Sequence, residues 1–273
     1  MKPIKQITSP DNDVFRGLRD SLDSKGIRKH GQFMVFGSRV VLDTLKIHGH
    51  LARNLVTCHS LANQDPVGDE IMALAQKRNQ TRTENSAPGL SILDLARPLF
   101  EELDIFGTKS PILVMQTPLL AELDLKTEPP QGLEILCALS DPANLGALIR
   151  SAAAFGAHRV ILLKESASPF HPRAVRSASA TTLTIPLVHG PSIRDLEFAK
   201  GPIAALDMTG EALTSFQWPQ GVRLLLGEEG LGVPRELTKA EMIKIPMAKG
   251  VESLNATVAA SIALFSYRCQ FPL

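Results

Sequence analysis

The stretch Ile245-Pro-Met-Ala-Lys-Gly-Val-Glu-Ser-Leu-Asn-Ala-Thr-Val-Ala-Ala-Ser-Ile-Ala-Leu-Phe265 closes the C-terminal half of the chain. Its first residues belong to a short apolar run, residues 242–247, which predicts a buried strand. After a polar turn, an alanine-rich helix is expected over residues 254–267, with Ser253 as its N-cap and Asn255 in its first turn. One face of this helix is expected in the core, because apolar residues recur at helical spacing: Leu254, Val258, Ile262 and Phe265. By itself, this is an ordinary strand and helix that close an α/β domain.

Upstream of this stretch, short apolar runs alternate with helical segments from Leu133 onward. Such alternation, with runs buried on both faces, is typical of a parallel sheet between two helical layers. We therefore predict an α/β domain over residues 133–273. The expected strands are residues 135–139, 160–163, 183–188, 203–206, 222–226 and 243–247. The expected helices before the terminal one are residues 145–155, 172–179, 193–200 and 234–239.

The first part of the chain predicts a smaller α/β domain over residues 1–116. A proline-rich segment of mixed charge, residues 117–132, is the expected linker. The expected helices of the smaller domain are residues 13–22, 40–47, 71–77 and 95–102. Its expected strands are residues 33–36, 54–58 and 112–115. Residues 24–31 are expected to form a basic loop that is either a solvated surface or a phosphate contact.

The composition limits the kinds of protein and of binding site that are expected. The 273 residues are 44% hydrophobic and 21% charged, with a net charge of +1, so a nucleic-acid site would be a local patch. The three cysteines, Cys58, Cys137 and Cys269, are widely separated, which indicates reduced thiols and no metal site. Neither a signal peptide nor an apolar stretch long enough to span a membrane is found in the sequence. A cytoplasmic protein without metal is expected.

Two loops after predicted strands carry chemistry. In open α/β sheets, ligands bind at the carboxyl ends of the strands. The loop of residues 140–144 precedes Arg150, an arginine among apolar and small residues that needs a partner or an anion. The loop Gly227-Glu-Glu-Gly-Leu-Gly232 matches no dinucleotide or phosphate-loop pattern, and its glutamates would repel a pyrophosphate. It suits a neutral or cationic ligand.

Three segments, taken together and in this order, resemble the motifs of the SpoU/TrmH family. They are Asp141-Pro-Ala-Asn-Leu-Gly-Ala-Leu-Ile-Arg150, Leu226-Gly-Glu-Glu-Gly-Leu-Gly232, and Ile245-Pro-Met with Ser253-Leu-Asn255. The segment around Arg173 and Arg176, and the N-terminal Ile7-Thr-Ser-Pro with Arg28, also look like parts of the family. The resemblance implies an S-adenosyl-L-methionine-dependent RNA 2′-O-ribose methyltransferase of the SPOUT superfamily. It also implies a trefoil knot in the C-terminal domain, where periodicity alone would suggest a doubly wound sheet.

The resemblance further implies site residues. The cofactor-binding positions would be Leu226, Gly227, Ile245, Met247 and Leu254. The catalytic region would consist of Asn144, Arg150, Ser253 and Asn255, with Glu229 beside it. An arginine is a poor general base, so we interpret Arg150 as a cation that stabilises a developing alkoxide and anchors a phosphate. Candidate RNA contacts are Arg28, Arg173 and Arg176. For Arg176, a structural role as an ion-pair partner is an equally good alternative.

The expected partners are RNA and a second copy of the chain, since family members are usually homodimers. Ribosomal RNA is expected before transfer RNA by analogy with two-domain members, and the sequence does not tell which nucleotide is methylated. Phe36 departs from the glutamate that is common at its position in the family, and Ala180 departs from a glycine. Two alternatives stay open: a catalytically silent RNA-binding protein on the same fold, and a Rossmann-type nucleotide-binding enzyme.

Overall fold

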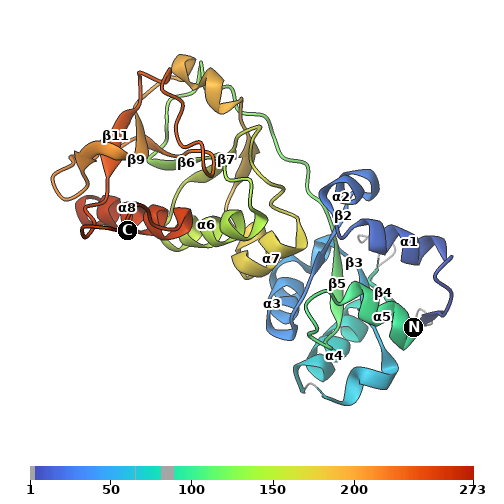
Figure 1. Ribbon diagram of the computed structural model, residues 1–273. Coiled ribbons are helices and arrows are strands. Elements are labelled where there is room, and N and C mark those ends of the chain that lie inside the picture. The colour runs from blue at the N-terminus through green and yellow to red at the C-terminus, as the bar shows by residue number, and fades with distance from the viewer. Residues whose placement is uncertain (1–3, 65, 81–88) are drawn as a thin grey trace. The chain divides into compact units, whose positions relative to one another are not determined.

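The protein consists of two compact units, as seen in a computed structural model that describes residues 4–64, 66–80 and 89–273 (Figure 1). The N-terminal unit comprises Met1–Pro118 together with Phe170–Arg176. The C-terminal unit comprises Leu119–Pro169 and Ser177–Leu273. A short segment from the second half of the sequence, which includes most of helix α7 (Pro172–Ala178), therefore belongs to the N-terminal unit.

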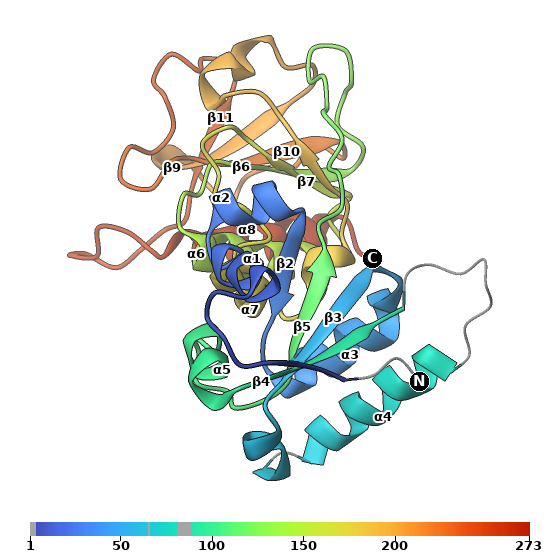
Figure 2. The ribbon, with the colours of Figure 1, turned by 90° about the vertical axis from the view of Figure 1, so that its right-hand side faces the viewer.

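A five-stranded sheet forms the centre of the N-terminal unit, in the order β1-β4-β3-β5-β2 (Figure 2). β5 is antiparallel to both of its neighbours, and the other four strands run parallel to one another. Helices α1 and α5 pack on one face through buried Phe15, Leu18 and Phe100. The strands are β1 (Lys5–Ile7), β2 (Gln32–Val35), β3 (Ala52–Thr57), β4 (Ser91–Leu95) and β5 (Ile112–Gln116). The helices are α1 (Asp13–Asp20), α2 (Ser24–His30), α3 (Ser38–His48), α4 (Pro66–Gln80) and α5 (Arg97–Leu103), with short 3₁₀ turns at Gly49–Leu51 and His59–Gln64.

Helix α2 corrects the prediction of a loop at residues 24–31. The side chain of Asp23 accepts a hydrogen bond from the Gly26 N–H at 2.8 Å and begins the helix, and Gly31, at φ +59°, ends it. Gly26 is required here because a Cβ atom would lie 1.9 Å from the Asp20 carbonyl oxygen. The glycine that suggested a loop instead permits close packing of α2 on the end of α1.

The C-terminal unit contains a six-stranded, fully parallel sheet in the order β11-β9-β10-β6-β7-β8, which confirms the predicted α/β class. Helices α6 (Pro142–Ala154) and α8 (Ala256–Gln270) cover one face (Figure 1). The other face is covered by the 3₁₀ segment Ile193–Phe198 and by Leu123 and Leu125, which are buried although they lie in the predicted linker. A further 3₁₀ turn spans Thr181–Leu183. The strands are β6 (Leu133–Cys137), β7 (Arg159–Leu162), β8 (Leu187–His189), β9 (Ile203–Ala212), β10 (Val222–Leu226) and β11 (Glu241–Lys244).

Helix α8 buries a different face from the predicted one. Its buried residues are Thr257, Ala260, Ala263, Leu264 and Tyr267. The small alanines allow α8 to pack closely against α6, and the larger apolar side chains point outward. Val258, Ile262 and Phe265 are 48%, 38% and 59% exposed, and Leu254, which precedes the helix, is 36% exposed, so the assignment of these four residues to the core was wrong.

Two other sequence predictions need correction. Asn255, not Ser253, is the N-cap of α8, because its side chain accepts hydrogen bonds from the backbone N–H groups of Thr257 and Val258. Residues 234–239 form turns rather than a helix. No helix among the described residues is long and apolar enough to cross a membrane. The trefoil knot stays a prediction.

Candidate active site

A cavity of about 840 Å³ opens in the C-terminal unit, at the carboxyl ends of β10 and β11 and beside the middle of β9. Its wall combines apolar side chains, three glycines and a few polar groups. This position is the one expected for ligands of open α/β sheets, and the volume suits a cofactor-sized molecule. The residues that line it include Asn144, Leu206, Asp207, Met208, Leu226, Gly227, Glu228, Glu229, Lys244, Ile245, Met247, Ser253 and Leu254.

A directed chain of hydrogen bonds joins the three motif segments at this cavity. Glu229 accepts from the Nδ2 atom of Asn144 at 2.7 Å. The Oδ1 atom of Asn144 then accepts from the Nδ2 atom of Asn255 at 3.1 Å. Finally, Oδ1 of Asn255 accepts from the first backbone N–H groups of α8. A carboxylate can only accept a hydrogen bond and a backbone N–H can only donate one. The two ends of this series of hydrogen bonds therefore determine the orientation of both asparagine amides.

Glu229 is the centre of this network. Its second oxygen accepts from the Ser140 hydroxyl at 3.1 Å and from the Asp141 N–H at 3.2 Å. Asp141 is the N-cap of α6, because its side chain accepts from the Asn144 N–H at 2.9 Å. Glu229 thus fixes the loop before α6, and its charge is favourable at a helix N-terminus.

The loop that carries Glu229 closes on itself through glycines. Glu228 and Gly232 exchange backbone hydrogen bonds of 3.0 and 2.8 Å. A Cβ atom on Gly227 would lie 2.4 Å from the Gly232 backbone, and Gly230 and Gly232 have φ angles of +83° and +73°. The glycines therefore build a tight loop at the cavity rather than a phosphate cradle.

All five predicted cofactor-binding residues line the cavity: Leu226, Gly227, Ile245, Met247 and Leu254. Of the predicted catalytic residues, Asn144, Glu229 and Ser253 line it, and Asn255 joins through its bond to Asn144. The sequence reasoning missed Asp207 and Lys244, which also line it. Asp207 is the fifth of the ten residues of β9, just after the apolar run that marked the strand, so no sequence signal pointed to it. Hydrogen bonds from Thr209 lower the pKa of Asp207.

Arg150 lies apart from the other predicted catalytic residues. It follows Asn144 by six positions in α6, roughly 9 Å along the helix axis. Its side chain is exposed, does not line the cavity, and has no hydrogen-bond or ion-pair partner within residues 4–64, 66–80 and 89–273. The expectation of an arginine enclosed by apolar residues was wrong, because Arg150 occupies the outer face of the helix.

The three predicted RNA-binding arginines all belong to the N-terminal unit and are exposed. Arg28 lies in α2, and Arg173 and Arg176 lie in α7. The guanidinium of Arg176 lies 4.3 Å from the centroid of the Phe106 ring, and that ring packs edge-on against buried Phe36 at 5.2 Å. Arg176 therefore makes a cation–π contact rather than the ion pair considered from the sequence.

No group of three or more metal-binding side chains is found in the part of the chain that the structure describes. Cys137 is the last residue of β6, and burial raises the pKa of its thiol to about 12. A neutral, fully buried thiol of this kind is not a reactive nucleophile. The polar side chains that line the cavity are an amide, three carboxylates, a hydroxyl and the amine of Lys244.

Comparison with known proteins relates this site to RNA methylation. Residues 134–265 match the model of the SpoU rRNA Methylase family. Over 265 residues, the chain is 37% identical to a protein of Syntrophobacter fumaroxidans called ribosomal RNA small subunit methyltransferase G 2, a match that covers 97% of this chain and 49% of that protein. The chain spans about half the length of the curated relatives it matches.

Two solved structures share the fold over nearly the whole chain. An AdoMet-bound rRNA methyltransferase from Sinorhizobium meliloti has a TM-score of 0.77 at 24% identity, covering 99% of both chains. The SpoU methyltransferase AviRb from Streptomyces viridochromogenes, in complex with AdoMet, has a TM-score of 0.74 at 25% identity. That match covers 95% of this chain and 98% of AviRb.

Proposed function

We propose that this chain transfers a methyl group from S-adenosyl-L-methionine to RNA, because residues 134–265 match the model of the SpoU rRNA Methylase family. The proposed acceptor is a ribose 2′-hydroxyl. The observation that carries the proposal is the cavity of about 840 Å³, at which the predicted cofactor-binding residues lie beside Asn144, Glu229 and Ser253.

The cavity wall fits the proposed cofactor. Apolar side chains suit an adenine ring, and the charged side chains along the wall are the acidic Asp207, Glu228 and Glu229 with one basic Lys244. An excess of negative charge favours a cationic ligand and disfavours a polyphosphate. When bound, S-adenosyl-L-methionine supplies an electrophilic methyl group on a positively charged sulfur. This charge argument also disfavours the Rossmann-type nucleotide-binding alternative.

The side chains around the cavity would position the acceptor. Asn144 and Asn255 are held in one orientation by Glu229 and by the start of α8, so they present fixed polar groups to a ribose. Fixed dipoles are worth more to catalysis than mobile ones, because they need no reorganisation during the reaction. Ser253 offers a hydroxyl at the same rim.

Arg150 would act in the site of a second copy of the chain. Within one chain it does not line the cavity, and its guanidinium is unpaired among the described residues. Ser253, Asn255 and Glu229 are exposed as well, although methyl transfer to a hydroxyl favours a site closed to water. A homodimer would supply both the cover and the cation that stabilises the developing alkoxide.

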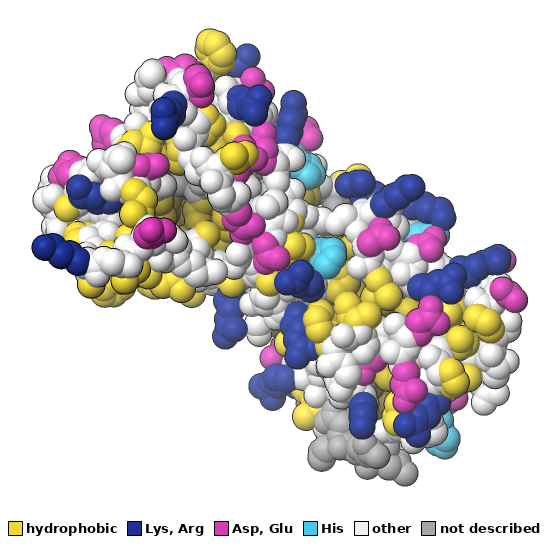
Figure 3. All heavy atoms as spheres, viewed as in Figure 1, with side chains coloured by type: hydrophobic (Ala, Val, Ile, Leu, Met, Phe, Trp, Pro, Cys, Tyr) yellow, Lys and Arg dark blue, Asp and Glu magenta, His cyan; other side chains and the backbone are white. Residues whose placement is uncertain are grey.

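The exposed apolar stripe of α8 supports this homodimer. Val258, Ile262 and Phe265 lie one helical turn apart along the outer side of α8, and the Phe265 ring lies 6.4 Å from that of Phe155 at the end of α6. Figure 3 shows hydrophobic side chains gathered along the edge of the C-terminal unit where α8 runs. A contiguous apolar patch of this kind marks an interface. We propose that α6 and α8 form it, in a domain that carries the trefoil knot.

The RNA substrate is proposed to be ribosomal RNA, with transfer RNA as the second candidate. The name of the Syntrophobacter relative refers to small-subunit rRNA, but this chain matches only 49% of that protein, so the name does not assign its target to this chain. We propose the N-terminal unit as the RNA-binding part, with phosphate contacts from Arg28 and Arg173. The stacking of Arg176 on Phe106 favours a structural role for that residue.

Calorimetry and mapping of methylated riboses test the proposal. The full chain should bind S-adenosyl-L-methionine and show no binding of NAD or ATP at the same cavity. Ribose methylation, mapped in rRNA and tRNA with and without the protein, should reveal one protein-dependent position. Binding of RNA without binding of S-adenosyl-L-methionine would favour the silent RNA-binding alternative, and methylation of a base would overturn the 2′-hydroxyl as acceptor.

Arg150→Lys separates binding from chemistry. Lysine keeps the charge but loses the planar fork of donors, so the variant should keep RNA binding within a fewfold and lose most turnover. Turnover near that of the wild type would remove Arg150 from the catalytic group.

A further inference from the structure

A second pocket, in the N-terminal unit, lies at the amino ends of the parallel strands. It has a volume of about 680 Å³ and is enclosed by the sheet on one side and by α1 on the other. Strands β1, β2, β3 and β4 all begin at this end of the sheet because they are parallel. This amino-end pocket is separate from the methylation site, which belongs to the other unit.

The floor of the amino-end pocket is a row of polar side chains at the start of the strands, on the sheet face that is otherwise apolar. Asn54 in β3 and Ser91 in β4 are register partners, so their side chains point to the same face of the sheet about 5 Å apart. Two residues farther along each strand, Val56 and Leu93 are buried in the core beneath α1. Gln32, at the start of β2, also lines the pocket. The sheet face therefore turns from apolar to polar just where the pocket opens.

Several of these polar groups have unused hydrogen-bonding capacity. Within the described ranges, the side chains of Asn54 and Ser91 have no hydrogen-bond partner, although both are half-buried. The amide nitrogen of Gln32 donates to the Gly17 carbonyl at 3.3 Å and to Ser21 Oγ at 3.1 Å, which leaves its oxygen as a free acceptor. These groups face an open pocket, so a ligand can supply the hydrogen-bond partners that water otherwise provides.

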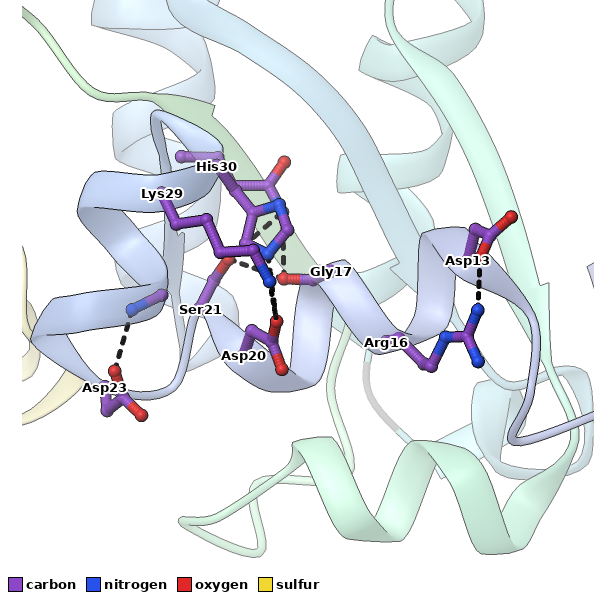
Figure 4. Close-up of polar contacts among 10 residues, drawn as sticks. Asp13, Arg16, Gly17, Asp20, Ser21, Asp23, Lys29 and His30 are labelled. Carbon is purple, nitrogen blue, oxygen red and sulfur yellow. Dashed lines mark hydrogen bonds and ion pairs between the residues drawn. The ribbon is translucent and has the colours of Figure 1, made fainter.

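The opposite wall is formed by α1. It combines the aliphatic side chains of Val14 and Leu18 with the carboxylate of Asp13, which is paired with Arg16. His30 lies at the side of the pocket, within 3.6 Å of the position of a Cβ atom on Gly17, and its Nε2 atom is held at 3.0 Å from Asp20 (Figure 4). The pocket is therefore a slot with aliphatic side chains on one side and donors and acceptors along the other.

Positive charge lies beside the slot. His30 ends α2, whose last turn also contains Arg28 and Lys29. Lys29 is paired with Asp20 at 3.1 Å, whereas Arg28 has no ion-pair partner among the residues described. Figure 3 shows Lys and Arg side chains gathered over α2. Lys5, which lines the pocket from β1, adds a second exposed cation.

We propose that the amino-end pocket binds an unpaired nucleobase, with Asn54 and Ser91 reading its edge and Lys5 meeting its phosphate. A base offers adjacent donors and acceptors, which an amide and a hydroxyl match directly, and a flat face of the base can pack on the aliphatic side chains of α1. Sequence-specific RNA recognition favours such splayed-out bases. The occupant is either a nucleotide within an RNA strand or a free mononucleotide, and we favour the strand, which rests on the proposed RNA substrate.

Direct binding to the full chain tests this inference. The probes are short single-stranded RNAs of A, C, G or U and the corresponding nucleoside monophosphates, with the other cavity saturated by S-adenosylhomocysteine. Asn54→Leu and Ser91→Ala remove the hydrogen-bonding groups with little change of side-chain shape, and each should weaken binding of the preferred base by about tenfold. Thr57→Val, at the far end of β3 and outside the pocket, is the matched control and should bind as the wild type does.

The outcomes are distinct. Binding of one RNA that the two pocket variants weaken and the control does not supports the inference, whether or not methyl transfer is found. The pocket would instead be assigned to a free nucleotide by a different result. In that case the two pocket variants weaken binding of a nucleoside monophosphate, and the RNA with the same base does not compete for the site. Equal binding by wild type and pocket variants of unchanged thermal stability, or binding of no probe, would overturn it.

Discussion

Asn255 and Asn144 are 111 residues apart in sequence, and their side chains meet at 3.1 Å, Nδ2 of the first donating to Oδ1 of the second. The same Asn255 side chain caps α8 through its oxygen. One residue thus couples the start of the last helix to the start of α6, where Thr257 adds a second bond to the Asn144 carbonyl at 3.1 Å. The local capping role and the role at the site use different atoms and can be separated.

Asn255→Asp separates them. Aspartate keeps the oxygen that caps α8 and favours the helix N-terminus, so the thermal midpoint should stay within a few degrees of the wild type. The donor to Asn144 is lost, however, and Asn144 cannot turn its amide because Glu229 requires a donor. Turnover should fall at least about a hundredfold.

Asn255→Ala is the control for the cap. It removes both functions and should also cost about 1 kcal/mol of stability. If Asn255→Asp keeps wild-type turnover, the Asn144–Asn255 bond has no part in the reaction.

The apolar stripe of α8 predicts a dimer that a single charge disrupts. Ile262 is the central exposed residue of the stripe, so Ile262→Asp should shift the protein to a monomer in analytical ultracentrifugation. Turnover should be lost with it, while binding of S-adenosyl-L-methionine weakens less. The matched control is Met208→Asp, at another exposed apolar residue of the same unit that is outside α8 and lines the cavity; it should stay dimeric. A monomeric wild-type protein would contradict this prediction.

Mixing two inactive variants tests whether Arg150 crosses the dimer. Dimers formed from Arg150→Ala and Asn255→Asp chains would contain one site with both residues intact if Arg150 serves the partner. Each variant alone should be inactive, and the mixture should regain up to about a quarter of wild-type turnover, since half of the chains would be in mixed dimers with one intact site each. Absence of recovery in a mixture shown to exchange subunits would place Arg150 and Asn255 in the same site of one chain.

The sequence predicted the C-terminal sheet well because its strands are apolar runs that need no tertiary information. It predicted the gathering of three motif loops only through the family resemblance, since residues far apart in sequence, such as Asn144 and Asn255, carry no local sign of contact. It failed where size mattered more than hydrophobicity: the core face of α8 is made by alanines. It failed again at α2, where Gly26 serves close packing.

Arg150 shows a different limit of sequence reasoning. Its apolar neighbours in sequence suggested burial, but residues 148 and 149 face the core and Arg150 faces away. A helix places successive residues about 100° apart, so neighbours in sequence do not share an environment. Asp207 and Lys244 were missed because a single charged residue within a strand or at its end carries no pattern.

The buried thiol of Cys137 predicts a loss of stability at alkaline pH. Burial raises its pKa to about 12 in the folded protein, whereas an unfolded thiol ionises near pH 8.5. The folded state therefore binds the thiol proton more tightly than the unfolded state does. The stabilisation from this difference is complete below about pH 8.5. As the pH rises from there towards the folded-state pKa, the free energy of unfolding falls by up to about 1.4 kcal/mol per pH unit. Urea unfolding should show a shallower alkaline decline in Cys137→Val, and an equal decline would contradict the assignment.

The last prediction concerns a buried ion cluster at the amino ends of β6 and β10. Glu134 and Arg223 are both fully buried, and Nε of Arg223 lies 2.9 Å from Oε2 of Glu134. The other oxygen of Glu134 accepts from Nε of Arg159 at 2.8 Å. Arg223 also donates to the carbonyls of Lys200 and Glu128, at 2.6 and 2.7 Å, so the cluster joins two loops to the sheet.

Glu134→Gln would leave two buried guanidinium groups facing a neutral amide, and should therefore lower the free energy of unfolding by about 3–5 kcal/mol. Glu128→Gln is the matched control, because its carboxylate is half-exposed and lies 3.7 Å from Arg159; it should cost less than about 1 kcal/mol. Urea unfolding of both variants measures the difference. The double variant Glu134→Leu with Arg223→Leu should be more stable than Glu134→Leu alone, because it removes one stranded charge. A double variant that is less stable by the sum of the two single losses would show that the two residues act independently.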